Sequence, residues 1–192
     1  TGVQTCALPI WKQVACGYKH IAAIKTDGTL WEWGFNYYGQ LGNGTTDNYS
    51  SPIQVGLLTN WKQISCGQYH VTAVKTDGTL WAWGYNSLGR LGNGTTDNYS
   101  SPIQVGLLTN WKQVIAGYNA TTAIKTDGTL WTWGTNAQGQ LGNGNIVNYS
   151  SPIQVGSLTT WKDIAIGQQN QIRSEEHTSE LQSHHDLVCR LL

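Results

Sequence analysis

The sequence predicts an all-β protein that forms part of a β-propeller, with three four-stranded blades and the start of a fourth arranged as an open arc. The first observation behind this prediction is an internal repeat. Trp11, Trp61, Trp111 and Trp161 recur every 50 residues without an insertion or deletion, and a period of this length is typical of propellers and solenoids. The second is composition, because 23 Gly, 10 Trp and only 11% charged residues are typical of short-stranded, turn-rich all-β folds.

Each copy contains four short segments with strand chemistry, which in the first copy are residues 12–16, 20–25, 29–34 and 52–55. The Asp27-Gly28 pair predicts a tight hairpin between the second and third segments, since Asp-Gly readily adopts positive φ angles. Alternation along the third strand places Trp31 and Trp33 on one face. We expect Pro52 at the first residue of the fourth strand, where no ladder hydrogen bond is lost. Four antiparallel strands without a helical segment indicate a propeller blade.

The two ends of the chain depart from the repeat. We expect a foreign tail at residues 1–10, repeats at 11–60, 61–110 and 111–160, a truncated repeat at 161–172, and a second foreign tail at 173–192. Both tails resemble translations of a common sequencing adapter, which identifies them as foreign to the fold. The alternative is a metal site made of Glu175, Glu176, His177, His184 and His185. These aperiodic polar residues lack the rigid spacing that a metal requires, so no metal or other cofactor is expected.

Charge and cysteine usage narrow the function classes further. The formal net charge is zero and no basic run occurs, which argues against a nucleic-acid partner. No apolar stretch reaches the roughly 20 residues of a membrane-spanning helix. Cys16 and Cys66 share a repeat position with Ala116 and Ile166. A position that accepts all three residue types predicts a small buried site rather than a disulfide.

Two histidines that recur in the repeat are the candidates for catalysis. His20 and His70 share a repeat position that is Ala120 in the third copy. The acidic residues that recur with them, such as Asp27, belong to the hairpin at the opposite end of the strands. No arrangement of nucleophile, base and orienting group follows from the sequence, so we expect structural histidines and a protein that is not an enzyme.

The most specific motif is the segment KTDGTLWEWGFNYYGQLGNGT, which returns as KTDGTLWAWGYNSLGRLGNGT and KTDGTLWTWGTNAQGQLGNGN. It resembles the repeat of the regulator of chromosome condensation family across residues 11–172. The resemblance implies a propeller that serves as an interaction surface. The eukaryotic founder of that family is an exchange factor that binds chromatin, but neither a wedge-like insertion nor a basic arm occurs here. The Trp- and Gly-rich style resembles bacterial members, some of them secreted or displayed on the cell surface, and only this resemblance favours an extracellular location.

Differences between the copies are concentrated at one end of the predicted blades. In a meander, the loops after the first and third strands emerge at the same end and the Asp-Gly hairpin at the other. The hairpin reads Lys-Thr-Asp-Gly-Thr in all three copies, whereas the other end varies and is rich in Tyr, a favoured residue at protein interfaces. The expected partner-binding residues are Tyr18, Lys19, Phe35, Tyr37, Tyr38, Gln68, Tyr69, Tyr85, Leu88, Arg90, Tyr118 and Asn119.

Two functions remain open at this point. The first is a protein-binding module, a fragment of a larger propeller, that uses the variable Tyr-rich face. The second is a carbohydrate-binding propeller with aromatic platforms in small pockets repeated once per blade. Neutral drift of exposed loops would explain the same variation without any function. We also expect the first and last blades each to leave an uncovered apolar face carrying Trp, so that the isolated chain self-associates.

Overall fold

The computed structural model describes residues 10–166 and 172–173, which form strands and turns without a helix among them. They make three four-stranded antiparallel sheets with the strands in chain order. The first is β1 (Trp11–Cys16), β2 (His20–Lys25), β3 (Leu30–Gly34) and β4 (Tyr49–Gln54); the second is β5 (Trp61–Cys66), β6 (His70–Lys75), β7 (Leu80–Gly84) and β8 (Tyr99–Gln104); the third is β9 (Trp111–Ala116), β10 (Ala120–Lys125), β11 (Leu130–Gly134) and β12 (Tyr149–Gln154).

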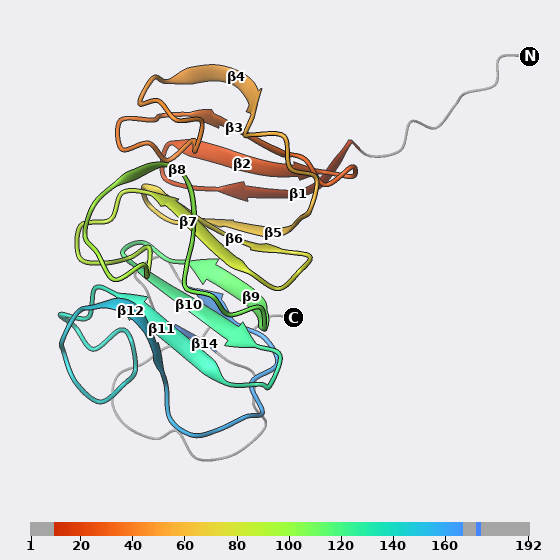
Figure 1. Cartoon of the computed structure of the whole chain (residues 1–192). Helices are drawn as coiled ribbons and strands as arrows, with labels where there is room; N and C mark the ends of the chain where they lie inside the picture. Colours follow the sequence, from red (N-terminus) through yellow and green to blue (C-terminus); the bar gives the residue numbers. More distant parts are fainter. Residues whose placement is uncertain (1–9, 167–171, 174–192) are drawn as a thin grey trace, which may run out of the picture.

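The three sheets succeed one another as blades, from the red strands at one end of Figure 1 to the cyan strands at the other, and do not close into a ring. The predicted open arc of blades is confirmed. Strands β13 (Ala165–Ile166) and β14 (Ile172–Arg173) pair with each other beyond the third blade. The predicted boundary at residue 172 falls inside β14, and most of both tails lies outside the described residues. No helix in the described chain is long and apolar enough to cross a membrane.

The predicted hairpin forms at Asp27-Gly28. The Asp27 carboxylate accepts hydrogen bonds from the Thr29 N–H (3.0 Å) and the Thr29 hydroxyl (2.6 Å). Gly28 has a φ of +81°, and a Cβ at this position would overlap the backbone oxygen of Thr59. Glycine is therefore required both by the turn and by the close approach of the next chain segment.

The fourth strand of each blade departs from the prediction. In the first blade it begins at Tyr49, three residues earlier than expected, so Pro52 lies inside the strand and not at its start. The register shifts between the pairs Glu32↔Ile53 and Gly34↔Tyr49. Residues 50–52 therefore bulge opposite a single residue of β3. An outer strand with a bulge tolerates Pro because the missing N–H has no ladder partner to lose.

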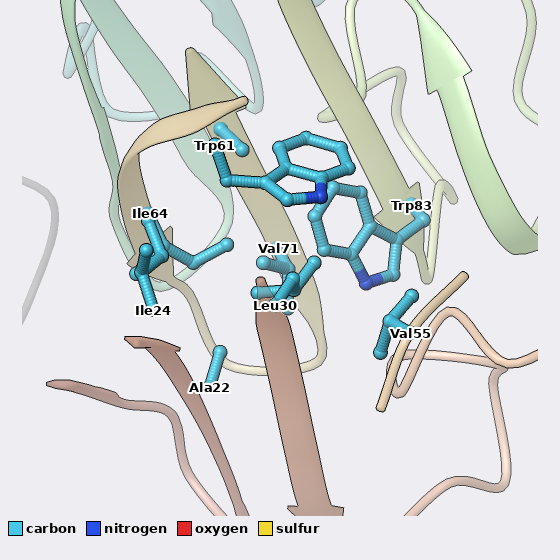
Figure 2. Close-up of a cluster of buried hydrophobic side chains, with 9 residues drawn as sticks. Ala22, Ile24, Leu30, Val55, Trp61, Ile64, Val71 and Trp83 are labelled. Atoms are coloured by element: carbon cyan, nitrogen blue, oxygen red, sulfur yellow. The ribbon is translucent and has the colours of Figure 1, made fainter. Parts of the chain in front are cut away.

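The core consists of layers between consecutive blades. Ala22, Ile24 and Leu30 from one face of the first blade pack against Trp61 and Trp83 from the facing side of the second (Figure 2). The second junction repeats this arrangement between the second and third blades, with Trp111 and Trp133. Each blade thus turns its tryptophans toward the blade before it, as the alternation of β3 predicts.

The first blade has no described neighbour on its tryptophan side. Val14 is 52% exposed there, whereas Ile64 at the same repeat position is 1% exposed. For the same reason Cys16 is exposed and Cys66 is half-buried, so the small buried site expected at this position is wrong for Cys16. The prediction of an uncovered Trp face on the last blade is also wrong. Its outer face carries Ile124 and Leu130, which pack with Ile164.

Glutamine side chains connect the blades at a position that the sequence analysis missed. Gln13 donates to the Ile64 carbonyl (2.9 Å) and accepts from the Ile64 N–H (3.0 Å). Gln63 makes the same two contacts with Val114, each at 3.0 Å. A side-chain amide thus replaces the strand pairing that neighbouring blades lack. The signal in the sequence was the identical Gln at residues 13, 63 and 113, beside a Lys that is exposed in each strand.

Candidate recognition surface

The two variable loops of each blade lie together at one end of the strands. The Phe35 N–H donates to the Lys19 carbonyl (2.8 Å), and the Tyr85 N–H donates to the Tyr69 carbonyl (2.8 Å). The third blade has the equivalent hydrogen bond between residues 135 and 119 (3.0 Å). The hairpins close the opposite ends of the same strands. Every predicted partner-binding residue therefore lies at the same strand end, on one face of the arc.

Six aromatic rings at this end form a connected group, here called the tyrosine cluster: Tyr18, Phe35, Tyr37, Tyr38, Tyr69 and Tyr85. Tyr69 occupies its centre, with ring centroids 5.1 Å from Tyr38 and 5.7 Å from Tyr18. Tyr38 reaches from the first blade to Tyr85 of the second at 4.3 Å. Aromatic pairs at such separations contribute roughly 0.5–1.5 kcal/mol each, so the cluster is ordered by its own contacts.

The cluster is partly open to solvent. Tyr37 is 68% exposed and Tyr18 is 59% exposed, while the other four rings are half-buried. Burial, followed by the neighbouring Tyr18 and Tyr38, raises the pKa of Tyr69. Tyr69 is therefore neutral at physiological pH, and the cluster offers apolar rings with hydroxyl groups.

Two cations adjoin the tyrosine cluster. The Lys19 ammonium lies 5.3 Å from the Tyr18 ring centroid, and the Arg90 guanidinium lies 4.5 Å from that of Tyr85. Arg90 is 2% exposed and donates to the Ser87 carbonyl (3.1 Å) and the Asn119 side chain (2.7 Å). Burial lowers the pKa of Arg90 to about 10, so it stays charged at neutral pH. The other copies have Gln at this position, which makes the charge specific to the second blade.

The remaining predicted residues extend the surface toward the third blade. The Gln68 side chain donates to the Tyr118 hydroxyl, and Tyr118 also acts on the pKa of Arg90. Leu88 is 44% exposed and makes none of these contacts; its φ of +71° is unusual for a residue with a side chain. The structure thus brings all the predicted residues together except Leu88, which stands apart at the loop tip.

The two histidines are buried and lie in the packing between blades. His70 Nε2 is 3.2 Å from the Thr121 hydroxyl of the next blade. The residue that corresponds to Thr121 one junction earlier is Val71, and neither ring nitrogen of His20 has a hydrogen-bond partner. Burial lowers the pKa of His20 to about 4 and that of His70 well below its usual value. Both rings are neutral and serve packing.

The unpaired His20 leads to a testable prediction. Val71→Thr gives His20 the hydroxyl partner that His70 already has, so we expect the free energy of unfolding to rise by about 1 kcal/mol. Thr121→Val removes the existing partner and should lower it by roughly 1–2 kcal/mol. Urea denaturation of both variants measures the two changes. Equal changes of one sign would show that the hydroxyl at this position does not act through histidine.

The carbohydrate alternative requires free aromatic faces, and the tryptophans at the hairpin end do not provide them. The Lys75 ammonium lies 3.4 Å from the Trp81 ring centroid, and Lys125 lies 3.5 Å from that of Trp131. The Trp131 indole N–H is already bound to the Thr129 hydroxyl at 2.8 Å. A sugar would have to displace the ammonium group before it could stack on that face.

Comparison with known sequences identifies the repeat. The family model described as the regulator of chromosome condensation (RCC1) repeat matches residues 27–74, 77–124 and 127–170. A second model of the same repeat matches residues 11–40, 61–90 and 111–140. The chain belongs to the RCC1 repeat family. The expected family and the propeller blade are both confirmed, and the RCC1 matches show that one 50-residue copy corresponds to one repeat.

Two solved structures share the fold. The structure of Prp20p from Saccharomyces cerevisiae has a TM-score of 0.70 at 22% identity, over 80% of this chain and 40% of that one. Human WBSCR16 has a TM-score of 0.68 at 25% identity, over 75% of this chain and 37% of that one. The Arabidopsis thaliana ultraviolet-B receptor UVR8 is 42% identical over 43 residues, which are 22% of this chain and 10% of the receptor. The chain therefore spans less than half the length of these relatives.

Proposed function

We propose that this protein is a non-catalytic recognition module, part of a larger propeller, that binds a protein partner through the tyrosine cluster and the adjoining loops. The observation that carries the proposal is the coincidence of two features at the loop end of the strands, opposite the hairpins. The copies differ there while the hairpin end is constant, and the varied residues make a partly exposed aromatic surface with the exposed Lys19 beside it and the buried Arg90 beneath Tyr85. Tyr and Arg are the residue types enriched among interface hot spots.

A relative supports a role in protein binding. The report on yeast Prp20p describes binding to Gsp1p and histones, and a further structure contains yeast RCC1 (Prp20) with Kap60. We infer only the general role, because the chain is 22% identical to Prp20p and covers 40–42% of it. We also propose that the protein has a bacterial source and an extracellular or cell-surface location. We propose further that residues 1–10 and 173–192 are foreign tails.

Selection of peptide ligands tests the binding surface without a known partner. A phage-displayed random library selected on the intact chain should return peptides that recognise its binding hot spot. Tyr18→Ala and Tyr37→Ala should each weaken these peptides at least about tenfold. Leu107→Ala is the matched control, since Leu107 is 91% exposed and follows β8, whose last residue pairs at the hairpin end. Peptides that depend on Leu107, or no enrichment at all, would contradict the proposal.

We infer further that the chain self-associates through the tryptophan side of the first blade. At the two internal junctions the tryptophan side of a blade is covered by the apolar face of the blade before it. On the first blade we expect a second copy of the chain to cover this side. Sedimentation velocity should show association that increases with protein concentration. Val14→Lys places a charge on the 52% exposed centre of this face and should leave a monomer. A native chain that stays monomeric at all concentrations would refute the inference.

A further inference from the structure

A cavity of about 300 Å³ lies at the junction between the second and third blades. Val105 and Leu108, from the connection between β8 and β9, form one side of it. Trp111, Trp131 and Pro152 of the third blade form the other. The volume is at the lower end of the range for small-molecule sites, and the lining is mostly apolar, as such sites usually are. Because two blades contribute walls, the cavity exists only where one blade follows another.

Lys125 provides the only charge among the residues that line this cavity. The side chain is 6% exposed, and its ammonium lies 3.5 Å from the Trp131 ring centroid and 4.9 Å from that of Trp111. Within the described chain it makes no hydrogen bond or ion pair. The carboxylate of Asp127 is engaged by the Thr129 N–H (3.0 Å) and hydroxyl (2.6 Å). The Lys125 Nζ is not among the fully buried polar atoms without a partner, so an anion that enters the cavity can reach it and pair with it.

The same site is encoded at the first junction. Each of the ten lining residues has an identical residue fifty positions earlier in the sequence. The Lys75 ammonium there lies 3.4 Å from the Trp81 ring centroid. In the first blade, Lys25 lies 3.6 Å from the Trp31 ring centroid, but no described blade precedes it. The first blade therefore has the ammonium–indole pair without the second wall of the cavity.

We propose that each blade junction binds a small carboxylate that has an apolar body. The carboxylate accepts a charge-assisted hydrogen bond from the ammonium of Lys75 or Lys125. The apolar body fits against the tryptophan, valine, leucine and proline side chains of the walls. The ammonium repels a cationic ligand, and a neutral ligand gains less from it than a carboxylate does. This site is separate from the tyrosine cluster and does not depend on the function proposed for that surface.

Titration with benzoate, compared with the neutral isostere benzamide, tests the proposal on the unsubstituted chain. Nitrogen-15 NMR should show the indole N–H signals of Trp81 and Trp131 shifting saturably with benzoate, while the signal of Trp31 stays unchanged. Benzamide should bind at least about tenfold more weakly, because its neutral carbonyl accepts a weaker hydrogen bond from the ammonium group than a carboxylate does. Equal binding of benzamide, equal shifts at Trp31 or no saturable shift would overturn the proposal.

Two matched variants assign the binding to the buried lysine. Lys125→Met should abolish the shift at Trp131 and preserve that at Trp81. Lys25→Met loses an equivalent ammonium–indole contact but no cavity, so it should leave both shifts intact. Near-ultraviolet circular dichroism shows whether each variant keeps its tertiary structure. If a variant loses its tertiary structure, the benzoate and benzamide titrations of the unsubstituted chain test the proposal. Benzoate binding at Trp131 that survives Lys125→Met would also overturn the proposal.

Discussion

Replacement of Trp83 by Ala is expected to lower the free energy of unfolding by about 3–5 kcal/mol. Trp83 has no exposed surface and packs with Leu30, Val55 and Val71 in the layer between the first two blades. Truncation would open a cavity there, and the rigid strands on both sides limit how far the layer can collapse. Urea denaturation with a two-state fit measures the loss.

Trp33→Ala is the matched control for this prediction. Trp33 occupies the same repeat position in the first blade, where no described blade covers it, and it is half-exposed. Its replacement should lower the free energy of unfolding by only roughly 1–2 kcal/mol, in proportion to the smaller apolar area that it buries. Equal losses for the two variants would contradict the assignment of the tryptophan side of the first blade as uncovered.

Glu32→Thr is expected to stabilise the protein by roughly 2 kcal/mol at neutral pH, because it removes a buried carboxyl group without partners. Glu32 has no exposed surface, and neither of its oxygens has a hydrogen-bond partner of normal geometry. The third copy has Thr132 at this position, whose hydroxyl donates to the Leu141 carbonyl (3.1 Å). The corresponding carbonyl in the first blade is that of Leu41, so Thr at residue 32 has an acceptor within reach.

The gain from Glu32→Thr should depend on pH. Burial raises the pKa of Glu32 well above its usual value, and the Trp83 indole opposes this shift only in part. Above the unfolded pKa of about 4.3, the folded chain holds a proton that the unfolded chain has released, so the parent loses stability as pH rises. The variant lacks this loss, so the gain should be smallest at about pH 4 and grow as pH rises.

The two buried histidines act in the opposite direction but do not disturb this comparison. Their lowered pKa values make the protein less stable as pH falls below about 6.5, because the unfolded chain then binds protons that the folded chain does not bind. Both histidines are present in parent and variant, so their contribution cancels in the difference. A stability difference that stays constant between pH 4.5 and pH 8 would show that Glu32 is not held in its neutral form.

The repeat made most of the fold predictable. Exact 50-residue spacing fixes equivalent positions, and the Asp-Gly turn and alternation of β3 then assign ends and faces to the strands. The start of β4 was missed because a bulge lets Pro52 lie inside an outer strand, which a rule based on regular pairing excludes. The exposure of Cys16 was missed because burial at this position depends on a neighbouring blade, and a single copy of the repeat does not reveal its neighbours.

The candidate surface was predictable in its residues but not in its internal contacts. Copy-to-copy variation identified the loops, and the meander placed them at one end. Two features needed coordinates: the place of Tyr69 among the rings, and the contact of the buried Arg90 with Asn119 of the next blade. Both depend on side chains that cross from one blade to the next, and separations of about 30 to 50 residues carry no local sequence signal for such contacts.

Hydrogen exchange of the chain with a selected peptide ligand tests most directly whether the variable end is the recognition surface. Amides in residues 17–19, 35–38 and 67–69 should gain protection on binding, because these loops carry the tyrosine cluster. The hairpins at residues 26–28 and 76–78 should exchange at unchanged rates. Protection confined to the hairpin end would contradict the assignment and transfer recognition to the face that is constant in all three copies.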